Sequence, residues 1–120
     1  AALFAAHHDL DNLLGIVDCN KIQALGDTKD VLSLEDLVAK WSAFGWAVRR
    51  IDGHDDAALE QTLSSVPFEV GRPSMIIADT IKGKGVSFME NELLWHYRCP
   101  DGDEFKCAME ELEGDANRDD

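Results

Sequence analysis

Two stretches of this 120-residue chain carry side chains suited to a divalent metal ion or a phosphate group. The first is residues 18–26, where Asn20 directly follows a short apolar run. The amide oxygen of Asn20 and the main-chain carbonyl of Ile22 would be two oxygen ligands, and Mg²⁺ accepts such ligands when carboxylate, water or phosphate completes the set. The alternative is that Asn20 only caps a turn, as Asn does at many loop starts. On the residues alone, this alternative is favoured.

The second stretch, residues 79–85, reads Asp-Thr-Ile-Lys-Gly-Lys-Gly. Gly83 and Gly85 would let the backbone approach a ligand closely. Lys82 and Lys84 would offer positive charge to a diphosphate or a sugar phosphate. A flexible surface turn explains the same residues equally well, so this motif alone does not specify a site.

His96 is the histidine best placed for chemistry, because it follows the glycine-containing stretch within residues 94–97. An imidazole can pass a proton to or from a substrate hydroxyl near neutral pH. The alternative is a half-exposed histidine that only stabilises its own loop. His7, His8 and His54 lie at expected helix ends or turns, and we predict structural roles for them.

Hydrophobic patterning predicts the elements that must hold these residues. Short continuous apolar runs are typical of strands buried in a parallel sheet, and apolar residues at i, i+3, i+4 and i+7 are typical of helices. Their alternation predicts a doubly wound α/β fold with a mainly parallel sheet. The strands are expected at 13–17, 46–51 and 75–78, and the helices at 1–8, 33–45, 55–67 and through 105–112.

Local signals set the expected ends of the helices. Ser33 with Asp36 has the spacing of a capping box, and Gly45 suits a C-terminal cap. Asp55 or Asp56 can cap the next helix. In doubly wound sheets, ligands bind beyond the carboxyl ends of the strands. That rule selects the loops after the first and third strands, which contain both stretches described above.

Composition narrows the classes of function. The 24 acidic and 11 basic residues give a net charge of -13, and residues 101–120 hold nine acids and two bases. We therefore predict an acidic C-terminal helix and tail over residues 101–120, separate from the domain over residues 1–100. A nucleic-acid-binding surface is not expected, because the sequence has no stripe of basic residues to neutralise phosphates. A membrane-spanning helix is not expected either, because no apolar run approaches the roughly 20 residues that such a helix needs. The three cysteines form no CxxC pair, which favours a reducing cytoplasmic compartment.

Several segments, taken in order, resemble the transketolase family. Together they cover roughly residues 1–100, which makes the combined signal far more specific than any one motif. The segments are 1–13, 17–23, 32–35, 41–46, 52–55 and 81–91.

The resemblance implies a partial thiamine-diphosphate-binding fold, with thiamine diphosphate and Mg²⁺ as cofactors. In the family, the metal ligands are the Asp of a Gly-Asp-Gly turn, an Asn and a main-chain carbonyl, and the last two positions match Asn20 and Ile22. The Gly-Asp-Gly turn is expected one helix upstream of Ala1, so the domain is predicted to be incomplete at its N-terminus. Ile81 is implied to border the thiazolium ring, Gly83 to belong to the cofactor loop, and His96 to lie near the diphosphate and substrate oxygens.

The resemblance also implies the transfer of a two-carbon ketol unit between phosphorylated sugars. The glutamate that activates the aminopyrimidine belongs, in this family, to a separate pyrimidine-binding domain or subunit. No segment of this chain matches that domain, so the chain is expected to be inactive alone. The complete enzyme would be a homodimer or a heterotetramer.

Three alternatives stay open. One is another thiamine-diphosphate enzyme, either like deoxyxylulose-phosphate synthase or a split-subunit enzyme of sugar biosynthesis, and the stretch at 95–98 with the early acidic end favours the split form. Another is a non-catalytic α/β interaction module. A nucleotide-binding Rossmann domain is disfavoured, because no GxGxxG follows the first strand.

Overall fold

The computed structural model describes residues 1–116, and the chain divides into two compact units. Unit 1 comprises Ala1–Cys19 and Leu34–Thr80, and unit 2 comprises Asn20–Ser33 and the residues from Ile81 onward. The boundary that the sequence places at residue 100 stays a prediction. The last four residues of the predicted acidic tail lie outside the described residues.

Unit 1 is built on a parallel sheet of three strands in the order β1-β5-β4. These strands are β1 (Leu14–Cys19), β5 (Ser74–Asp79) and β4 (Ala47–Asp52), and both pairings are parallel and in register along their length. The central strand β5 is buried at all but its last residue. The predicted α/β fold with a parallel sheet is therefore confirmed.

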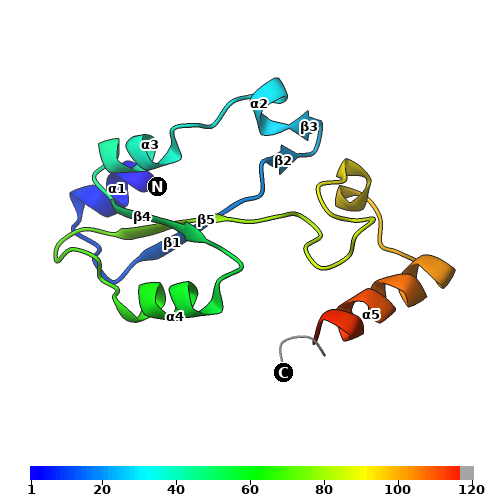
Figure 1. Cartoon of the computed structure of the whole chain (residues 1–120). Coiled ribbons are helices and arrows are strands. Elements are labelled where there is room, and N and C mark those ends of the chain that lie inside the picture. The colour runs from blue at the N-terminus through cyan, green and yellow to red at the C-terminus, as the bar shows by residue number, and fades with distance from the viewer. Residues whose placement is uncertain (117–120) are drawn as a thin grey trace. The chain divides into compact units, whose positions relative to one another are not determined.

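Helices cover both faces of this sheet, with α1 (Ala2–His7) and α3 (Leu37–Ala43) on one side and α4 (Asp56–Ser64) on the other (Figure 1). The Trp46 indole N–H donates to the Ala2 carbonyl at 3.1 Å and so ties α1 to the start of β4. The buried core beneath α1 and α3 consists of Ala5, Cys19, Trp46, Met75 and Ile77.

The predicted start of α3 at Ser33 was wrong by one helical turn. The N-cap is Asp36, whose carboxylate accepts from the N–H groups of Val38 and Ala39 at 2.8 and 3.2 Å. Leu34 matches the apolar period of the helix but lies before it and is 44% exposed. The cap that satisfies the free N–H groups determined the helix start more strongly than the apolar repeat did.

Two other predicted caps agree with the structure, but α4 ends at Ser64, three residues before the Pro67 that was expected to stop it. Asp55, and not Asp56, caps α4, because its carboxylate accepts from the Ala58 N–H at 3.0 Å. Gly45 follows the C-cap of α3 with a φ of +91°, a conformation that favours glycine.

The first strand was expected to be buried on both faces, and this was wrong on one face. Ile16 of β1 is 57% exposed, although its partner Ile76 on β5 is fully buried. Successive side chains of a strand point to opposite faces, and the helix on the face of Ile16, α4, packs on β4. Within the described residues β1 is an edge strand, so Ile16 lacks a covering helix.

Unit 2 contains regular structure that the sequence did not predict. Residues 21–33, expected to be a polar loop, form a hairpin of β2 (Ile22–Gln23) and β3 (Gly26–Asp27), followed by α2 (Thr28–Val31). The stretch 79–103, expected to be irregular, includes the 3-10 helix η1 (Leu93–His96). The predicted C-terminal helix is present as α5 (Gly102–Ala116), with Ala108 buried.

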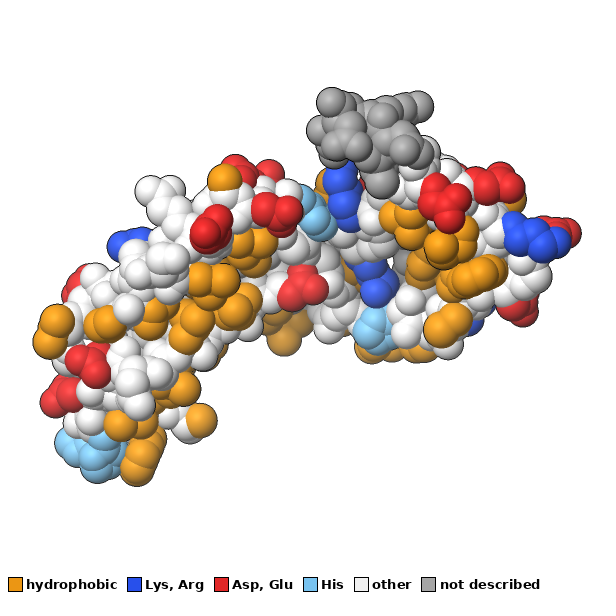
Figure 2. Space-filling view, turned by 90° about the horizontal axis from the view of Figure 1, so that it is seen from below, with side chains coloured by type: hydrophobic (Ala, Val, Ile, Leu, Met, Phe, Trp, Pro, Cys, Tyr) orange, Lys and Arg blue, Asp and Glu red, His pale blue; other side chains and the backbone are white. Residues whose placement is uncertain are grey.

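The surface drawn in Figure 2 carries acidic side chains scattered among apolar ones, and its basic side chains form no continuous stripe. Across residues 1–116, no helix is both long enough and apolar enough to cross a membrane.

Candidate functional site

Asn20 begins the loop that leaves β1, and its side chain is held by the main chain of that loop. Its Oδ1 accepts from the Ile22 N–H at 3.0 Å, and both residues are half-buried. The turn-capping interaction considered from the sequence is therefore present. It does not exclude a metal ligand, because an amide oxygen has two lone pairs and this hydrogen bond uses one of them.

The register of the hairpin shows where the Ile22 carbonyl points. The Lys21 carbonyl accepts from the Thr28 N–H at 2.8 Å, so Lys21 and Thr28 form a hydrogen-bonded pair. The next pair, Ile22 and Asp27, must then be a non-hydrogen-bonded one, whose N–H and C=O groups point away from the partner strand. The Ile22 carbonyl consequently lies on the strand edge where its N–H meets Asn20, and the two candidate oxygens share that edge.

These donors have the chemistry that Mg²⁺ prefers, since both are hard oxygen atoms. Neither carries a charge, and within residues 1–116 no group of three or more His, Cys, Asp or Glu side chains is placed to hold a metal. The Asn20 and Ile22 oxygens fit as part of a coordination shell that takes its carboxylate, water and phosphate ligands from elsewhere.

Gly83 is required by the packing of its own loop. Its φ is +74°, and a Cβ atom here would lie 2.5 Å from the Met89 carbonyl oxygen. The loop is closed beside it by the Asn91 N–H, which donates to the Lys82 carbonyl at 2.9 Å. The close backbone approach expected for a ligand is thus made to Met89, and a contact of Gly83 with the cofactor stays a prediction.

The Gly83→Ala variant is expected to lose about 1–3 kcal/mol of unfolding free energy, since it combines a left-handed backbone with a steric overlap. Gly71→Ala is the matched control, because Gly71 has a φ of +77° but nothing within 4 Å of its Cβ position. Denaturant melts followed by circular dichroism would compare the two. Equal losses would show that packing on Met89 contributes nothing.

The remaining residues of this loop are tied to the chain itself. Glu90 accepts from the Gly85 N–H at 3.1 Å and lies 4.0 Å from the Lys84 ammonium. Ile81 is half-buried, and its carbonyl accepts from the Lys84 N–H at 3.2 Å. The positive charge of Lys84 is therefore partly neutralised by Glu90, which makes Lys84 less suited to bind a phosphate.

His96 lies at the end of η1 and is exposed, with its ring centroid 5.1 Å from that of Tyr97. η1 packs against β2, so the structure brings the segment of His96 to the segment of Ile22. All the predicted site residues belong to unit 2, although they come from both of its sequence segments.

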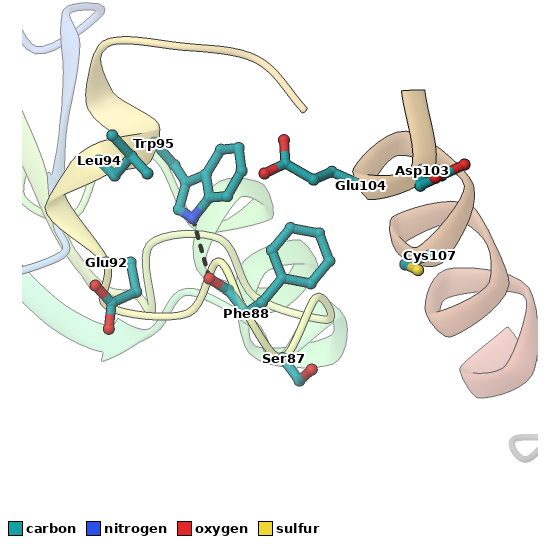
Figure 3. Close-up of a pocket in the computed structure, with 8 residues that line it drawn as sticks. All are labelled: Ser87, Phe88, Glu92, Leu94, Trp95, Asp103, Glu104 and Cys107. Atoms are coloured by element: carbon teal, nitrogen blue, oxygen red, sulfur yellow. Dashed lines mark hydrogen bonds between the residues drawn. The ribbon is translucent and has the colours of Figure 1, made fainter. Parts of the chain in front are cut away.

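Trp95 anchors η1 beside a hollow that the sequence did not predict (Figure 3). The Trp95 indole N–H donates to the Phe88 carbonyl at 3.0 Å, and the two rings are 5.4 Å apart. The Arg98 guanidinium lies 4.6 Å from the centre of the Trp95 ring and forms an ion pair with Glu104. The hollow has a volume of about 530 Å³ and is lined by Ser87, Phe88, Glu92, Leu94, Trp95, Asp103, Glu104 and Cys107.

In unit 1, the carboxyl edge of the sheet carries an arginine between two carboxylates. Arg50 donates to both Asp79 oxygens at 2.7 and 2.8 Å and to both Glu35 oxygens at 3.1 Å. These hydrogen bonds, with Asp79 contributing most, raise the pKa of Arg50. The same guanidinium, helped by the Leu37 N–H, lowers the pKa of Glu35 below the ordinary value of 4.5.

Stability is expected to depend on the ionisation of Glu35. A carboxyl whose pKa is lower in the folded state stabilises the fold above its ordinary value, and this contribution is lost as pH falls through the folded pKa. Below pH 4.5 the melting temperature of the wild type should therefore fall more steeply than that of Glu35→Gln. The difference is expected to be small, since the Glu35 side chain is 49% exposed. Thermal melts across the acid range would test it, and parallel curves would contradict it.

The chain was compared with known protein families and curated proteins. The profile described as "Transketolase, thiamine diphosphate binding domain" matches residues 1–116. An apulose-4-phosphate transketolase subunit of Actinobacillus succinogenes is 46% identical over 112 residues, which is 93% of this chain and 40% of that protein. A 6-deoxy-6-sulfo-D-fructose transketolase subunit of Clostridium sp. is 42% identical over 94% of this chain and 41% of its own length. The chain thus spans about 40% of the length of these two relatives.

Solved structures agree with this result. The crystal structure of transketolase from Campylobacter jejuni superposes with a TM-score of 0.81 at 29% identity, covering 93% of this chain and 17% of that one. A transketolase complex from Pichia stipitis gives a TM-score of 0.83 at 23% identity, a likeness that concerns the fold alone.

Proposed function

The chain belongs to the transketolase family, in its thiamine diphosphate binding domain, and from this premise we propose that it supplies the diphosphate- and Mg²⁺-binding part of a ketol-transferring enzyme. The observation that supports this best is the paired arrangement of Asn20 and Ile22. One hydrogen bond fixes the amide oxygen beside Ile22, and the hairpin register directs the Ile22 carbonyl to the same edge.

In the proposed site, Asn20 Oδ1 and the Ile22 carbonyl would hold Mg²⁺, and a carboxylate from outside residues 1–116 would complete the protein ligands. Ile81 offers an apolar wall beside the cofactor, and the backbone at Gly83 contributes to the same loop. When bound, thiamine diphosphate supplies the carbanion chemistry that lets a two-carbon unit leave one sugar and join another.

His96 is the proposed proton-transfer residue. It is exposed at the end of η1, and η1 lies against the strand that begins with Ile22. From there the imidazole takes a proton from a sugar hydroxyl and returns it, a role that suits a histidine near neutral pH. The contacts of Trp95 with Phe88 hold the short helix that presents this ring.

A partner is also part of the proposal. Both relatives described above are named as transketolase subunits. We infer that this chain likewise works with a pyrimidine-binding partner that brings the activating glutamate, as a heterotetramer or a homodimer, in the cytoplasm. The substrates would be phosphorylated sugars, and the relatives' names favour a split-subunit transketolase over a deoxyxylulose-phosphate synthase.

The test uses the protein as it occurs naturally, together with the proposed partner subunit. Calorimetric titration with thiamine diphosphate is expected to show binding that requires Mg²⁺. Ketol transfer between sugar phosphates should then be detected, and condensation of pyruvate with glyceraldehyde 3-phosphate should not. Pyruvate condensation without ketol transfer would reassign the reaction, and failure to bind cofactor would indicate an interaction module.

A further inference from the structure

The side chain of Arg50 lies on the face of the sheet that carries the buried core. Arg50 pairs in register with Ile77, which is opposite Val17 on β1. Side chains two residues apart share a face, so Asp79 and Cys19 lie on the same face one step closer to the carboxyl edge. Arg50 reaches both, with Asp79 held by two hydrogen bonds and the Cys19 sulfur 3.9 Å from Nη2.

The residues that Arg50 contacts are the last ones of their strands. Cys19 ends β1 and immediately precedes Asn20, while Asp79 ends β5 and is followed by Thr80 and Ile81. Two further hydrogen bonds join the strand ends, from the Gly53 N–H to the Asp79 carbonyl at 2.7 Å and from Thr80 Oγ1 to Asp18.

Glu35 extends this arrangement to α3. It lies directly before the N-cap Asp36, and the Arg50 fork holds both of its carboxylate oxygens. A planar guanidinium can hold two carboxylates in fixed directions at once, whereas an ammonium group cannot. Arg50 therefore links the approach to α3 with the exits of β1 and β5.

We propose that Arg50 is a positioning residue for the cofactor site, which fixes the points where the loops carrying Asn20 and Ile81 leave the sheet. This inference rests on the proposed function, because it assigns those loops to Mg²⁺ and thiamine diphosphate. Arg50 would act through the strand ends, and it is not proposed as a ligand of the metal or of the substrate. Groups hydrogen-bonded directly to a metal ligand commonly contribute roughly 10–100-fold to metal affinity. Arg50 acts one step further away, so its effect is expected near the lower end of that range.

The experiment compares Arg50→Lys and Arg50→Met with the wild type in the full-length protein and its partner. The dissociation constant of Mg²⁺ at saturating thiamine diphosphate is measured by titration, well below the melting temperature of each variant. Both variants are expected to bind Mg²⁺ about tenfold or more weakly. Arg50→Lys should not retain the wild-type Mg²⁺ affinity, since lysine keeps the positive charge but lacks the planar guanidinium that holds two carboxylates at once.

Arg49→Met is the matched control. Arg49 is the neighbouring residue on β4, and its side chain lies on the other face, bonded to Ser65 and 4.2 Å from the centre of the Phe68 ring. Its removal should lower the melting temperature without changing Mg²⁺ affinity. If Arg50→Met fails to fold, the Mg²⁺ affinities of Arg50→Lys and Glu35→Gln test the inference instead. Glu35→Gln should weaken Mg²⁺ binding by a smaller factor than Arg50→Lys, because Arg50 and Asp79 remain paired.

Wild-type Mg²⁺ affinity in Arg50→Lys would overturn the inference, as would an equal loss in Arg49→Met. Failure of the proposed function would look different, because the wild type itself would then bind neither Mg²⁺ nor thiamine diphosphate.

Discussion

Replacing Asn20 by alanine in the assembled enzyme is expected to raise the Mg²⁺ and thiamine diphosphate concentrations needed for half-maximal activity by about 100-fold or more. The reason is that two features are lost together: the proposed oxygen ligand of the metal, and the acceptor that holds the Ile22 N–H at 3.0 Å. Removing a residue that only supports a metal ligand commonly lowers metal affinity or activity roughly 10–100-fold, and removing a direct ligand should lower it more. Activity measured against each cofactor in turn would give these values, with turnover largely restored at saturation.

Asn20→Asp is the informative companion variant. It keeps an oxygen that can accept from the Ile22 N–H and can face the metal, so Mg²⁺ should still bind. Asn12→Ala removes an exposed asparagine outside the loop and should leave the cofactor requirement unchanged. If the Mg²⁺ concentration for half-maximal activity were the same in Asn20→Ala and the wild type, Asn20 would only cap the turn and would not bind the metal.

The parts of the fold that could be predicted from sequence are those with a strong local pattern. The apolar run that became β5 is long enough to mark a strand buried on both faces, and every residue from Ser74 to Ala78 is indeed buried. α4 was also accessible to prediction, because the cap Asp55 marks its start. For β4 only the apolar residues 46–48 at its beginning gave a signal, since Arg49 and Arg50 follow them. The hairpin of β2 and β3 was missed because strands of two residues are too short to show any alternation.

Other errors arise because burial depends on what covers an element. The residues of β1 gave no sign that Ile16 would be exposed, since exposure depends on the position of α4 and on the order of the strands. The start of α3 was misplaced for a different reason. Leu34 continues the apolar repeat by coincidence, and the decisive signal was the single carboxylate of Asp36.

The candidate site could be proposed from sequence because each of its parts lies within one short segment of the chain. Asn20 and Ile22 are two residues apart, so the resemblance to the family could identify both. The direction of the Ile22 carbonyl required the hairpin register, which no local pattern provides. Arg50 could not be connected to Glu35 or Asp79, which lie 15 and 29 residues away in sequence, until the pairing of β4 with β5 was known.

The second large effect is expected at His96, and it should differ in kind from that at Asn20. His96→Ala removes the group proposed to transfer protons and leaves the proposed metal ligands in place. General acid–base catalysis typically contributes about 10²–10⁴-fold, so kcat should fall within that range. The Mg²⁺ and thiamine diphosphate requirements should change little. Steady-state kinetics, with each cofactor varied separately, would separate the two parameters.

Two companion variants distinguish proton transfer from a structural role of the η1 loop. His96→Gln retains a hydrogen-bonding side chain but cannot exchange a proton near neutral pH, so it should be as slow as His96→Ala. Tyr97→Ala removes the neighbouring ring, whose centroid is 5.1 Å away, and keeps the imidazole, so most of kcat should survive. Rescue by glutamine would mean that His96 only orients the substrate. Equal loss of cofactor affinity in His96→Ala and Asn20→Ala would contradict the separate roles proposed for these residues, since Asn20 is a proposed metal ligand and His96 is not.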